Sequence, residues 1–175
     1  MNVDQVALRP IAEDDLETLT RFSVEPEVAG LFGWLGWSDP GRWRRRWAEN
    51  GFLDAESGLL LVVHGAERLG FVSWRKSLTS RTSYCWNVGI ALLPEARGRG
   101  FGTRAQRLLA EYLFAHTQVA RVEAVTEFTN VAEQRALEKA GFTREGVLRA
   151  YSFRNGRWRD AVLYSVVRDE VDLPG

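Results

Sequence analysis

Two kinds of hydrophobic spacing alternate along this chain. Apolar residues that recur every three or four positions predict helices near residues 13–22, 28–32, 41–50, 103–116 and 132–140. Short apolar or alternating runs predict strands at residues 6–11, 59–64, 69–76, 84–92 and 121–126. Two last strands, 142–153 and 158–167, flank Asn155-Gly156, a strong hairpin turn. The order predicts an α/β protein, with a mixed sheet of about seven strands and about four helices on its faces.

Composition fits one domain, which we place at residues 6–170, in a chain of 175 residues. Lys plus Arg and Asp plus Glu are both 23, so the net charge of zero gives no general attraction to nucleic acid or to anionic membranes. The chain opens without a basic and apolar leader, and no apolar run reaches about 18 residues. Cys85 is the one cysteine, and we expect a buried structural thiol and a cytoplasmic protein.

The most informative segment is Arg97-Gly98-Arg99-Gly100-Phe101-Gly102, between a predicted strand and a predicted helix. Glycine permits close approach of the backbone to a ligand, and the first turn of a helix offers unpaired N–H groups. Together they suit a phosphate or pyrophosphate, although an ordinary tight connection has the same composition. A dinucleotide-binding fold would place G-x-G-x-x-G near its start, and a P-loop needs G-K-[ST], which the chain lacks here.

A second motif gives the loop a context. Arg97, Gly100 and Gly102 fill the pattern R/Q-x-x-G-x-G/A, and residues 130–142 read N…E-K-x-G-F. The two motifs in this order resemble the GNAT acyltransferase superfamily over residues 6–168. Leu8-Arg9-Pro10 and residues 156–160 make the chain look closest to the ribosomal-protein N-terminal acetyltransferases within it.

The resemblance implies an N-acyltransferase that moves an acyl group from acyl-CoA, most simply acetyl-CoA, to a primary amine through a ternary complex. It implies that two neighbouring parallel strands, around 88–92 and 121–126, splay apart to admit the pantetheine arm. It also implies that N–H groups near Gly89 and Ile90 polarise the thioester carbonyl. The residues expected to bind the cofactor are Gly89, Ile90, Leu92, Arg97, Gly98, Arg99, Gly100, Phe101, Gly102, Thr103 and Asn130.

The transfer needs a neutral amine, so a base or a water relay must remove a proton. Glu123, on the strand beside the expected thioester, and Glu127, at its end, are the candidates, although no motif supports either and a surface carboxylate is the simpler interpretation of each. Asn130 suits an N-cap as well as a contact with the pantetheine arm. The family often places Ser three residues after this Asn, or Tyr in mid-helix, to protonate the departing thiolate. This chain has Glu133 and Leu137 there, which leaves Tyr151 as a substitute acid or no side-chain acid at all.

Seven tryptophans are many for this length. Trp34 and Trp37 lie beside Gly33 and Gly36 in a segment that roofs the acceptor pocket in GNAT folds. We expect them, with Trp86, to contact the acceptor and favour a bulky or apolar amine, while ordinary packing is the alternative.

Other functions stay open from the sequence. The acceptor is a small-molecule amine or a protein N-terminus, and the donor could be an acyl-carrier protein instead of CoA. A non-catalytic module that binds acyl-CoA or an amine is the rival class. His64 and His116 lack the spacing of metal ligands, so we expect no metal. We expect a monomer or a homodimer, with no nucleic acid or membrane partner.

Overall fold

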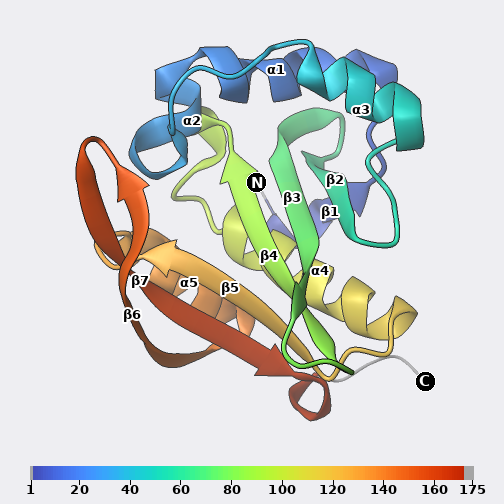
Figure 1. Ribbon diagram of the computed structural model, residues 1–175. Helices are drawn as coiled ribbons and strands as arrows, with labels where there is room; N and C mark the ends of the chain where they lie inside the picture. The colour runs from blue at the N-terminus through green and yellow to red at the C-terminus, as the bar shows by residue number, and fades with distance from the viewer. Residues whose placement is uncertain (1, 172–175) are drawn as a thin grey trace.

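A computed structural model describes residues 2–171. Seven strands form one sheet in the order β1-β2-β3-β4-β5-β7-β6 (Figure 1). All neighbours pair antiparallel except β4 and β5, which are parallel. The predicted mixed sheet of about seven strands is therefore confirmed. The strands are β1 (Val6–Arg9), β2 (Ser57–His64), β3 (Glu67–Leu78), β4 (Tyr84–Leu92), β5 (Arg121–Glu127), β6 (Thr143–Arg154) and β7 (Arg157–Val167).

Five α-helices lie between residues 2 and 171, one more than the rough number expected. In Figure 1, α4 and α5 lie behind the sheet, while α1, α2 and α3 gather at its upper end. The helices are α1 (Leu16–Val24), α2 (Pro26–Gly33), α3 (Arg42–Asn50), α4 (Phe101–His116) and α5 (Val131–Ala140). Within residues 2–171 we find no helix with both the length and the apolar character that a membrane crossing needs.

Strand β2 separates two hydrophobic cores because successive side chains of a strand point to opposite faces. Leu60 and Val62 pack with α4 and α5 in the larger core. Leu59, Leu61 and Val63 pack with α1 and with Trp43 of α3 in the smaller one. The all-apolar run that predicted this strand is thus explained by burial on both faces.

The parallel pair of β4 and β5 is short. Its register joins Trp86 to Val122, Asn87 to Glu123 and Val88 to Ala124, and then stops. Both strands continue beyond these pairs, β4 to Leu92 and β5 to Glu127. From Gly89 onward, β4 therefore has a strand neighbour only on its β3 side, which pairs with it as far as Leu92. The two strands diverge, and the space between their ends is called the β4–β5 gap below.

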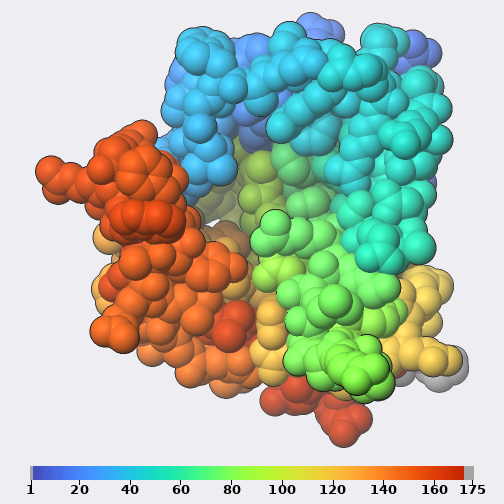
Figure 2. Space-filling model, in the orientation of Figure 1, coloured from blue at the N-terminus to red at the C-terminus, as the bar shows by residue number. Residues whose placement is uncertain are grey.

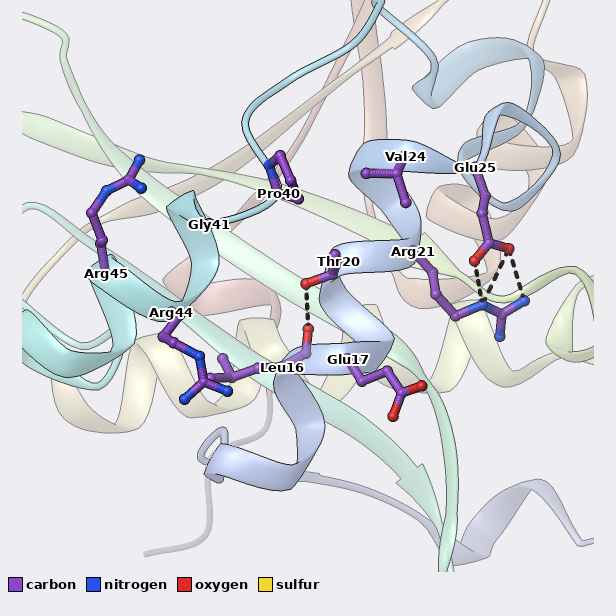
Figure 3. Close-up of a pocket in the computed structure, with 10 residues that line it drawn as sticks. All are labelled: Leu16, Glu17, Thr20, Arg21, Val24, Glu25, Pro40, Gly41, Arg44 and Arg45. Carbon is purple, nitrogen blue, oxygen red and sulfur yellow. Dashed lines mark hydrogen bonds and ion pairs between the residues drawn. The ribbon is translucent and has the colours of Figure 1, made fainter.

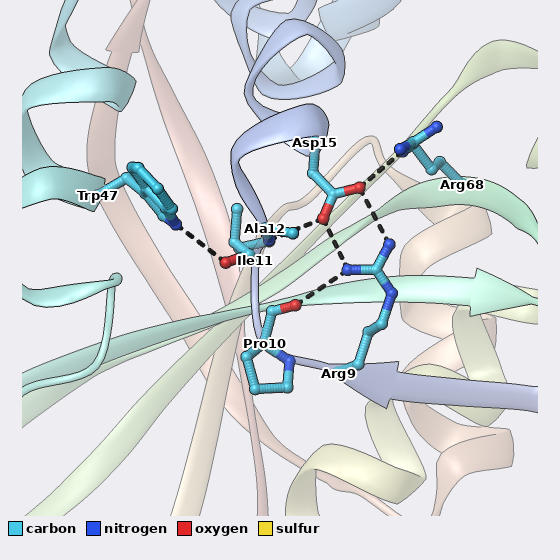
Figure 4. Close-up of polar contacts among 7 residues, drawn as sticks. All are labelled: Arg9, Pro10, Ile11, Ala12, Asp15, Trp47 and Arg68. Atoms are coloured by element: carbon cyan, nitrogen blue, oxygen red, sulfur yellow. Dashed lines mark hydrogen bonds and ion pairs between the residues drawn. The ribbon is translucent and has the colours of Figure 1, made fainter.

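The buried carboxylate of Asp15 connects the segment that follows β1 with strands β1 and β3 (Figure 4). Asp15 has a fully buried side chain and accepts hydrogen bonds from Arg9 of β1 and Arg68 of β3, at 2.6 Å each. The Ala12 N–H donates to the same carboxylate at 2.8 Å. Burial by itself would raise the pKa of Asp15, but these donors outweigh it and hold the pKa well below its usual range.

Candidate functional site

The Arg/Gly loop, residues 97–102, joins the short 3₁₀ turn Pro94–Ala96 to α4. Gly98 and Gly100 have positive φ angles of 70° and 82°, a left-handed conformation that side chains disfavour. Gly100 is the residue before the first turn of α4, where N–H groups lack partners inside the helix. The backbone therefore forms an anion cradle at the start of a 16-residue helix.

The arginines of this loop are held by backbone carbonyl groups. Arg97 donates from Nε to the Leu92 carbonyl at 2.9 Å and from Nη2 to the Val28 carbonyl of α2. It lies against Gly30, where an added Cβ would approach Arg97 Nη1 to 2.9 Å. Arg99 donates to the Glu95 carbonyl and lies 4.9 Å from the Phe101 ring centre. Arg97 thus joins α2 to the loop, a structural role that the motif alone does not reveal.

Phe101 and Thr103 differ in what they offer a ligand. The Phe101 side chain is buried in the larger core, with its ring 5.5 Å from that of His64, so only its backbone faces a ligand. Thr103 is partly exposed on the first turn of α4. The next residue, Arg104, has a buried Nε without a hydrogen-bond partner among the described residues. Arg104 belongs to the basic cluster of Arg97, Arg99, Arg104 and Arg107 that the sequence contains, but its burial depends on packing and could not be read from the sequence.

The β4–β5 gap opens beside this loop. Gly89 is exposed, and Ile90 and Leu92 are partly exposed, on the part of β4 that has left β5. Backbone groups of β4 that point toward β5 have no strand partner there. The gap therefore offers hydrogen-bonding groups to an extended ligand arm, as the resemblance implied.

Asn130 closes the other side of the gap. Its Oδ1 accepts from the Glu133 N–H at 3.3 Å, which caps α5, and its Nδ2 donates to Thr126 Oγ1 of β5 at 3.1 Å. The predicted N-cap is thus seen directly. The contact with a pantetheine arm stays a prediction.

Both candidate bases form ion pairs. Glu123 accepts from Arg121 at 2.9 Å, and Arg121 also binds Glu145. Glu127 accepts from Arg154 at 2.7 and 2.9 Å and from the Thr129 hydroxyl at 2.7 Å. The Arg154 hydrogen bond is the main reason that the pKa of Glu127 lies below its usual value. Glu127 is therefore a weaker base for an ammonium proton than an ordinary glutamate.

Tyr151 and Glu133 differ in how far their side chains are exposed to solvent. Tyr151 is 48% exposed, in a stretch of β6 where the register with β7 shifts between Leu148 and Ser152. Glu133 lies on α5, where burial raises its pKa to about 7. Sequence reasoning noted Glu133 only as a departure from a motif, because burial of a helix residue depends on what packs over it.

The predicted acceptor tryptophans separate into two groups. Trp34 and Trp37 contact each other edge to face at 5.0 Å, and Trp37 is 76% exposed. Trp86 is 4% exposed in the larger core, and its Nε1 donates to the Thr117 hydroxyl. The expectation that Trp86 contacts the acceptor is therefore corrected, because the inner face of β4 is covered by α4.

Figure 2 shows a hollow between the orange hairpin of β6 and β7 and the blue N-terminal helices. Arg154 of β6 bridges this space, since its guanidinium lies 5.6 Å from the Phe32 ring centre of α2 and pairs with Glu127 of β5. Exposed apolar side chains occur on both sides, namely Leu31, Leu35, Trp37, Tyr151, Phe153 and Trp158.

A separate groove of about 580 Å³ runs between α1 and the start of α3 (Figure 3). Its arginines already have partners, since Arg21 binds Glu25, Arg44 binds Glu13 and Arg45 binds Asp39. None of its lining residues belongs to the Arg/Gly loop or to the β4–β5 gap. It is not the candidate site.

The structure combines a mixed sheet whose parallel strands diverge with a glycine-rich turn at the start of a helix, and comparison with known proteins assigns this arrangement to a family. The family described as Acetyltransferase (GNAT) domain matches residues 5–143, so this chain belongs to the GNAT acetyltransferase family. The family prediction is therefore confirmed.

Several known proteins are similar to this chain. A putative ribosomal N-acetyltransferase of Bacillus subtilis, YdaF, is 30% identical over 73% of this chain and 66% of its own length. Two other Bacillus subtilis relatives are YoaA, at 36% identity, and YjcK, at 34% identity. The aligned part of this chain spans about half the length of these relatives, 46% in both cases.

Solved structures share the fold. Spermidine N-acetyltransferase from Vibrio cholerae, in complex with CoA and spermine, superposes with a TM-score of 0.82 at 17% identity, over 95% of this chain and 98% of that one. RimL, a ribosomal L7/L12 alpha-N-protein acetyltransferase in complex with CoA, gives 0.79 at 18% identity, over 95% and 96%.

Proposed function

We propose that this chain, as a single domain over residues 6–170, transfers an acetyl group from acetyl-CoA to a primary amine. The amine attacks the thioester directly while both substrates are bound. The observation that carries the proposal is the β4–β5 gap, which opens beside the glycine cradle of residues 98–102. An extended thioester arm and its pyrophosphate fit these two features together.

Different residues of the proposed acetyl-CoA site bind different parts of the cofactor. Backbone N–H groups from Gly98 to Thr103 hold the pyrophosphate, with Arg99 and Arg104 adding positive charge. Unpaired backbone groups near Gly89 and Ile90 orient and polarise the thioester carbonyl. Leu92 and the Asn130 amide border the pantetheine arm, and Arg97 keeps the loop joined to α2.

The acceptor amine must lose a proton, and we propose Glu123 as the first acceptor of that proton, through water. In the register of the parallel strands, Glu123 lies beside Asn87, one residue pair before the β4–β5 gap begins. Its side chain is on the other face of the sheet from the buried side chains of Val122 and Ala124. Glu127 is the second candidate, although its pair with Arg154 favours a structural role. Glu123→Gln should lower kcat at pH 7 more than Glu127→Gln does. Full activity of both variants would place the base elsewhere.

We propose that the amine carries a bulky apolar neighbour. The Trp34–Trp37 pair follows α2 and the exposed aromatic residues belong to the β6–β7 hairpin, the two parts of the chain between which Figure 2 shows the hollow, and broad apolar surfaces of this kind bind apolar groups. Relatives are named for spermidine and for ribosomal-protein N-termini, so both acceptor classes belong in the test.

The test is release of CoA thiol from acetyl-CoA with tryptamine, spermidine and a peptide that has a free apolar N-terminus. Tryptamine or the peptide should react faster than spermidine. Trp37→Ala should raise the acceptor KM several-fold and leave the acetyl-CoA Kd and the melting temperature unchanged, because Trp37 is 76% exposed. Spermidine as the best substrate, or parallel loss of both substrates in Trp37→Ala, would contradict the apolar-acceptor proposal.

The same assay separates the remaining alternatives. Thiol release only from an acyl-carrier protein would identify a carrier-bound donor, and tight CoA binding without turnover would identify a binding module. We propose the cytoplasm as the compartment, since the single thiol of Cys85 is buried.

A further inference from the structure

Arg159 of β7 is a charged side chain to which the proposed reaction gives no part. It is partly buried, and its Nε is shielded from solvent without a hydrogen-bond partner among residues 2–171. Over the same residues it takes part in no ion pair and in no contact with an aromatic ring. A buried donor without an acceptor is costly, and a ligand that supplies the acceptor removes that cost.

The register of the sheet places Arg159 on the same face as Glu127. Glu127 of β5 pairs with Ala161 of β7, and directly paired residues of antiparallel strands lie on one face. Arg159 precedes Ala161 by two residues, so it lies on that face as well. Ala124 of β5 is on the opposite face, in the larger core with α4 and α5. Arg159 therefore lies on the side of the sheet away from these helices, which faces the viewer in Figure 1.

Arg154 of β6 lies close to this position, because it is opposite Arg157 in the hairpin register, two residues from Arg159. It donates to both carboxylate oxygens of Glu127, at 2.7 and 2.9 Å, and the Thr129 hydroxyl donates to one of them at 2.7 Å. The Arg154 hydrogen bond is the main cause of the lowered pKa of Glu127, and the charge of Arg159 adds to it without an ion pair. Because Glu127 is already bonded, Arg159 contributes a positive charge that no carboxylate of the described residues neutralises by contact.

This uncompensated charge lies near the hollow proposed for the acceptor. Arg154 bridges that hollow, because its guanidinium pairs with Glu127 and lies 5.6 Å from the Phe32 ring centre of α2 (Figure 2). Glu127 in turn is three residues beyond Ala124, the last residue of β5 that pairs with β4. Arg159 thus shares a face of the sheet with the two groups that connect the hollow to the β4–β5 gap.

The chemistry of arginine indicates the ligand. Its guanidinium is planar and offers donors in a fork that matches the two oxygens of a carboxylate. We propose that Arg159 binds a carboxylate of the acceptor, which makes the preferred acceptor an amine with an apolar group and an acidic group. An aromatic amino acid or a short apolar peptide with a free C-terminus has this chemistry. This inference rests on the proposed acetyl transfer and narrows its acceptor. A polycation such as spermidine would instead be repelled by the same charge.

The first experiment compares amines that differ only in a carboxylate. Tryptophan is tryptamine with a carboxylate added, and phenylalanyl-glycine has a free C-terminus that its amide lacks. Thiol release from acetyl-CoA gives kcat/KM for each amine, expressed per concentration of neutral amine so that differences in amine pKa do not enter. In at least one pair the carboxylate form should be favoured by about 10-fold or more, since the two pairs place the carboxylate at different distances from the amine. No preference in either pair would overturn the proposal.

Variants then locate the preference. Arg159→Gln should lower kcat/KM for the favoured carboxylate form by about 10- to 100-fold and leave its carboxylate-free partner nearly unchanged. Arg159→Lys should restore only part of the loss, because lysine keeps the charge but not the planar fork. Arg157→Gln removes an equal charge at an exposed position of the same strand and is the control. Equal losses in Arg159→Gln and Arg157→Gln would show general attraction of anions and would overturn the proposal.

Binding of the product decides the same question without turnover. With CoA present, calorimetry should give a Kd for N-acetyltryptophan that is about 10-fold higher or more in Arg159→Gln than in wild type, while N-acetyltryptamine should bind both proteins alike. The two proteins should have equal melting temperatures, because the described residues offer Arg159 no partner. Equal affinity for N-acetyltryptophan, or no binding of it, would overturn the role of Arg159. Failure of every amine to release thiol would contradict the proposed acetyl transfer, and the comparison of product binding would still decide the carboxylate site.

Discussion

At the scale of single residues, buried ionisable groups have the strongest effects on stability and reactivity. Asp15 is the clearest case, because its fully buried carboxylate depends on Arg9, Arg68 and the Ala12 N–H. A paired buried charge stabilises a fold only while its partners stay in place. Cys85, in the middle of the sheet, is also buried, and burial keeps its thiol protonated by raising the pKa to about 11.

Asp15→Ala should lower the free energy of unfolding by about 3 kcal/mol, because two arginines lose their partner. Its folded-state pKa lies below the unfolded value of about 4, so its contribution is complete above about pH 5 and disappears as pH falls. Urea unfolding from pH 7 to pH 3 measures both effects. Asp14→Asn, at an exposed neighbour, is the control and should change stability by less than about 0.5 kcal/mol. Equal curves for Asp15→Ala and wild type would refute the argument.

Cys85 should resist alkylation by iodoacetamide at pH 8 in the native protein and react after unfolding in guanidinium chloride. Burial, with the nearby negative charge of Glu123, raises its pKa to about 11, and only the thiolate is a good nucleophile. Mass spectrometry of labelled protein gives the extent of reaction. Rapid labelling of native protein would show that the β4 region opens easily.

At the scale of elements, the junction between β4 and α4 combines folding and binding. Gly100 needs its left-handed backbone, so any side chain there strains the fold as well as the site. Gly102 is different, because it lies inside the first turn of α4 and has no positive φ. Substitution at Gly102 therefore separates binding from stability.

Gly102→Leu should raise the Kd of acetyl-CoA at least ten-fold, while Gly102→Ala, which the loop pattern R/Q-x-x-G-x-G/A accepts, should leave the Kd and the melting temperature nearly unchanged. An added Cβ would lie 3.4 Å from Leu92 Cδ1 and 3.8 Å from Ile90 Cδ1, which are ordinary contacts. Alanine also favours a helix over glycine by about 0.5–1 kcal/mol. The lost affinity would thus come from space that the phosphate needs. Calorimetry measures the Kd, and Gly33→Ala, another helical glycine with room for a methyl group, is the control. Normal affinity in Gly102→Leu would contradict the position of the pyrophosphate.

At the scale of the whole molecule, two parts of the sheet meet over a short seam. Only three residue pairs join β4 to β5, while α4 and α5 pack together behind them. The proposed CoA site would bring the ligand against the first turn of α4 on one side and the start of α5 on the other. Such a ligand should strengthen the connection between the two parts.

CoA at 100 times its Kd should raise the melting temperature by about 5–10 °C. Binding to the native state alone gives about 2.7 kcal/mol at this ratio, and each kcal/mol moves the melting temperature of a chain of this size by about 2–4 °C. Scanning calorimetry with and without CoA makes the measurement. Gly102→Leu at the same CoA concentration should show a much smaller rise, and an equal rise in both proteins would mean that CoA binds elsewhere.

The order of helices and strands, the hairpin at Asn155-Gly156 and the glycine cradle followed from the sequence alone. Each depends on local properties, namely the period of apolar residues, turn chemistry and the φ freedom of glycine. The same local motifs identified the family, which the match over residues 5–143 confirms.

What only the tertiary structure decided concerns burial and pairing between distant segments. Arg97 binds a carbonyl of α2, Trp86 lies in the core, and Glu127 pairs with Arg154, 27 residues away. Glu133 has a raised pKa only because surrounding elements shield it from water. The sequence determines which groups are present, but their solvation and partners depend on contacts that form when the sheet and helices pack.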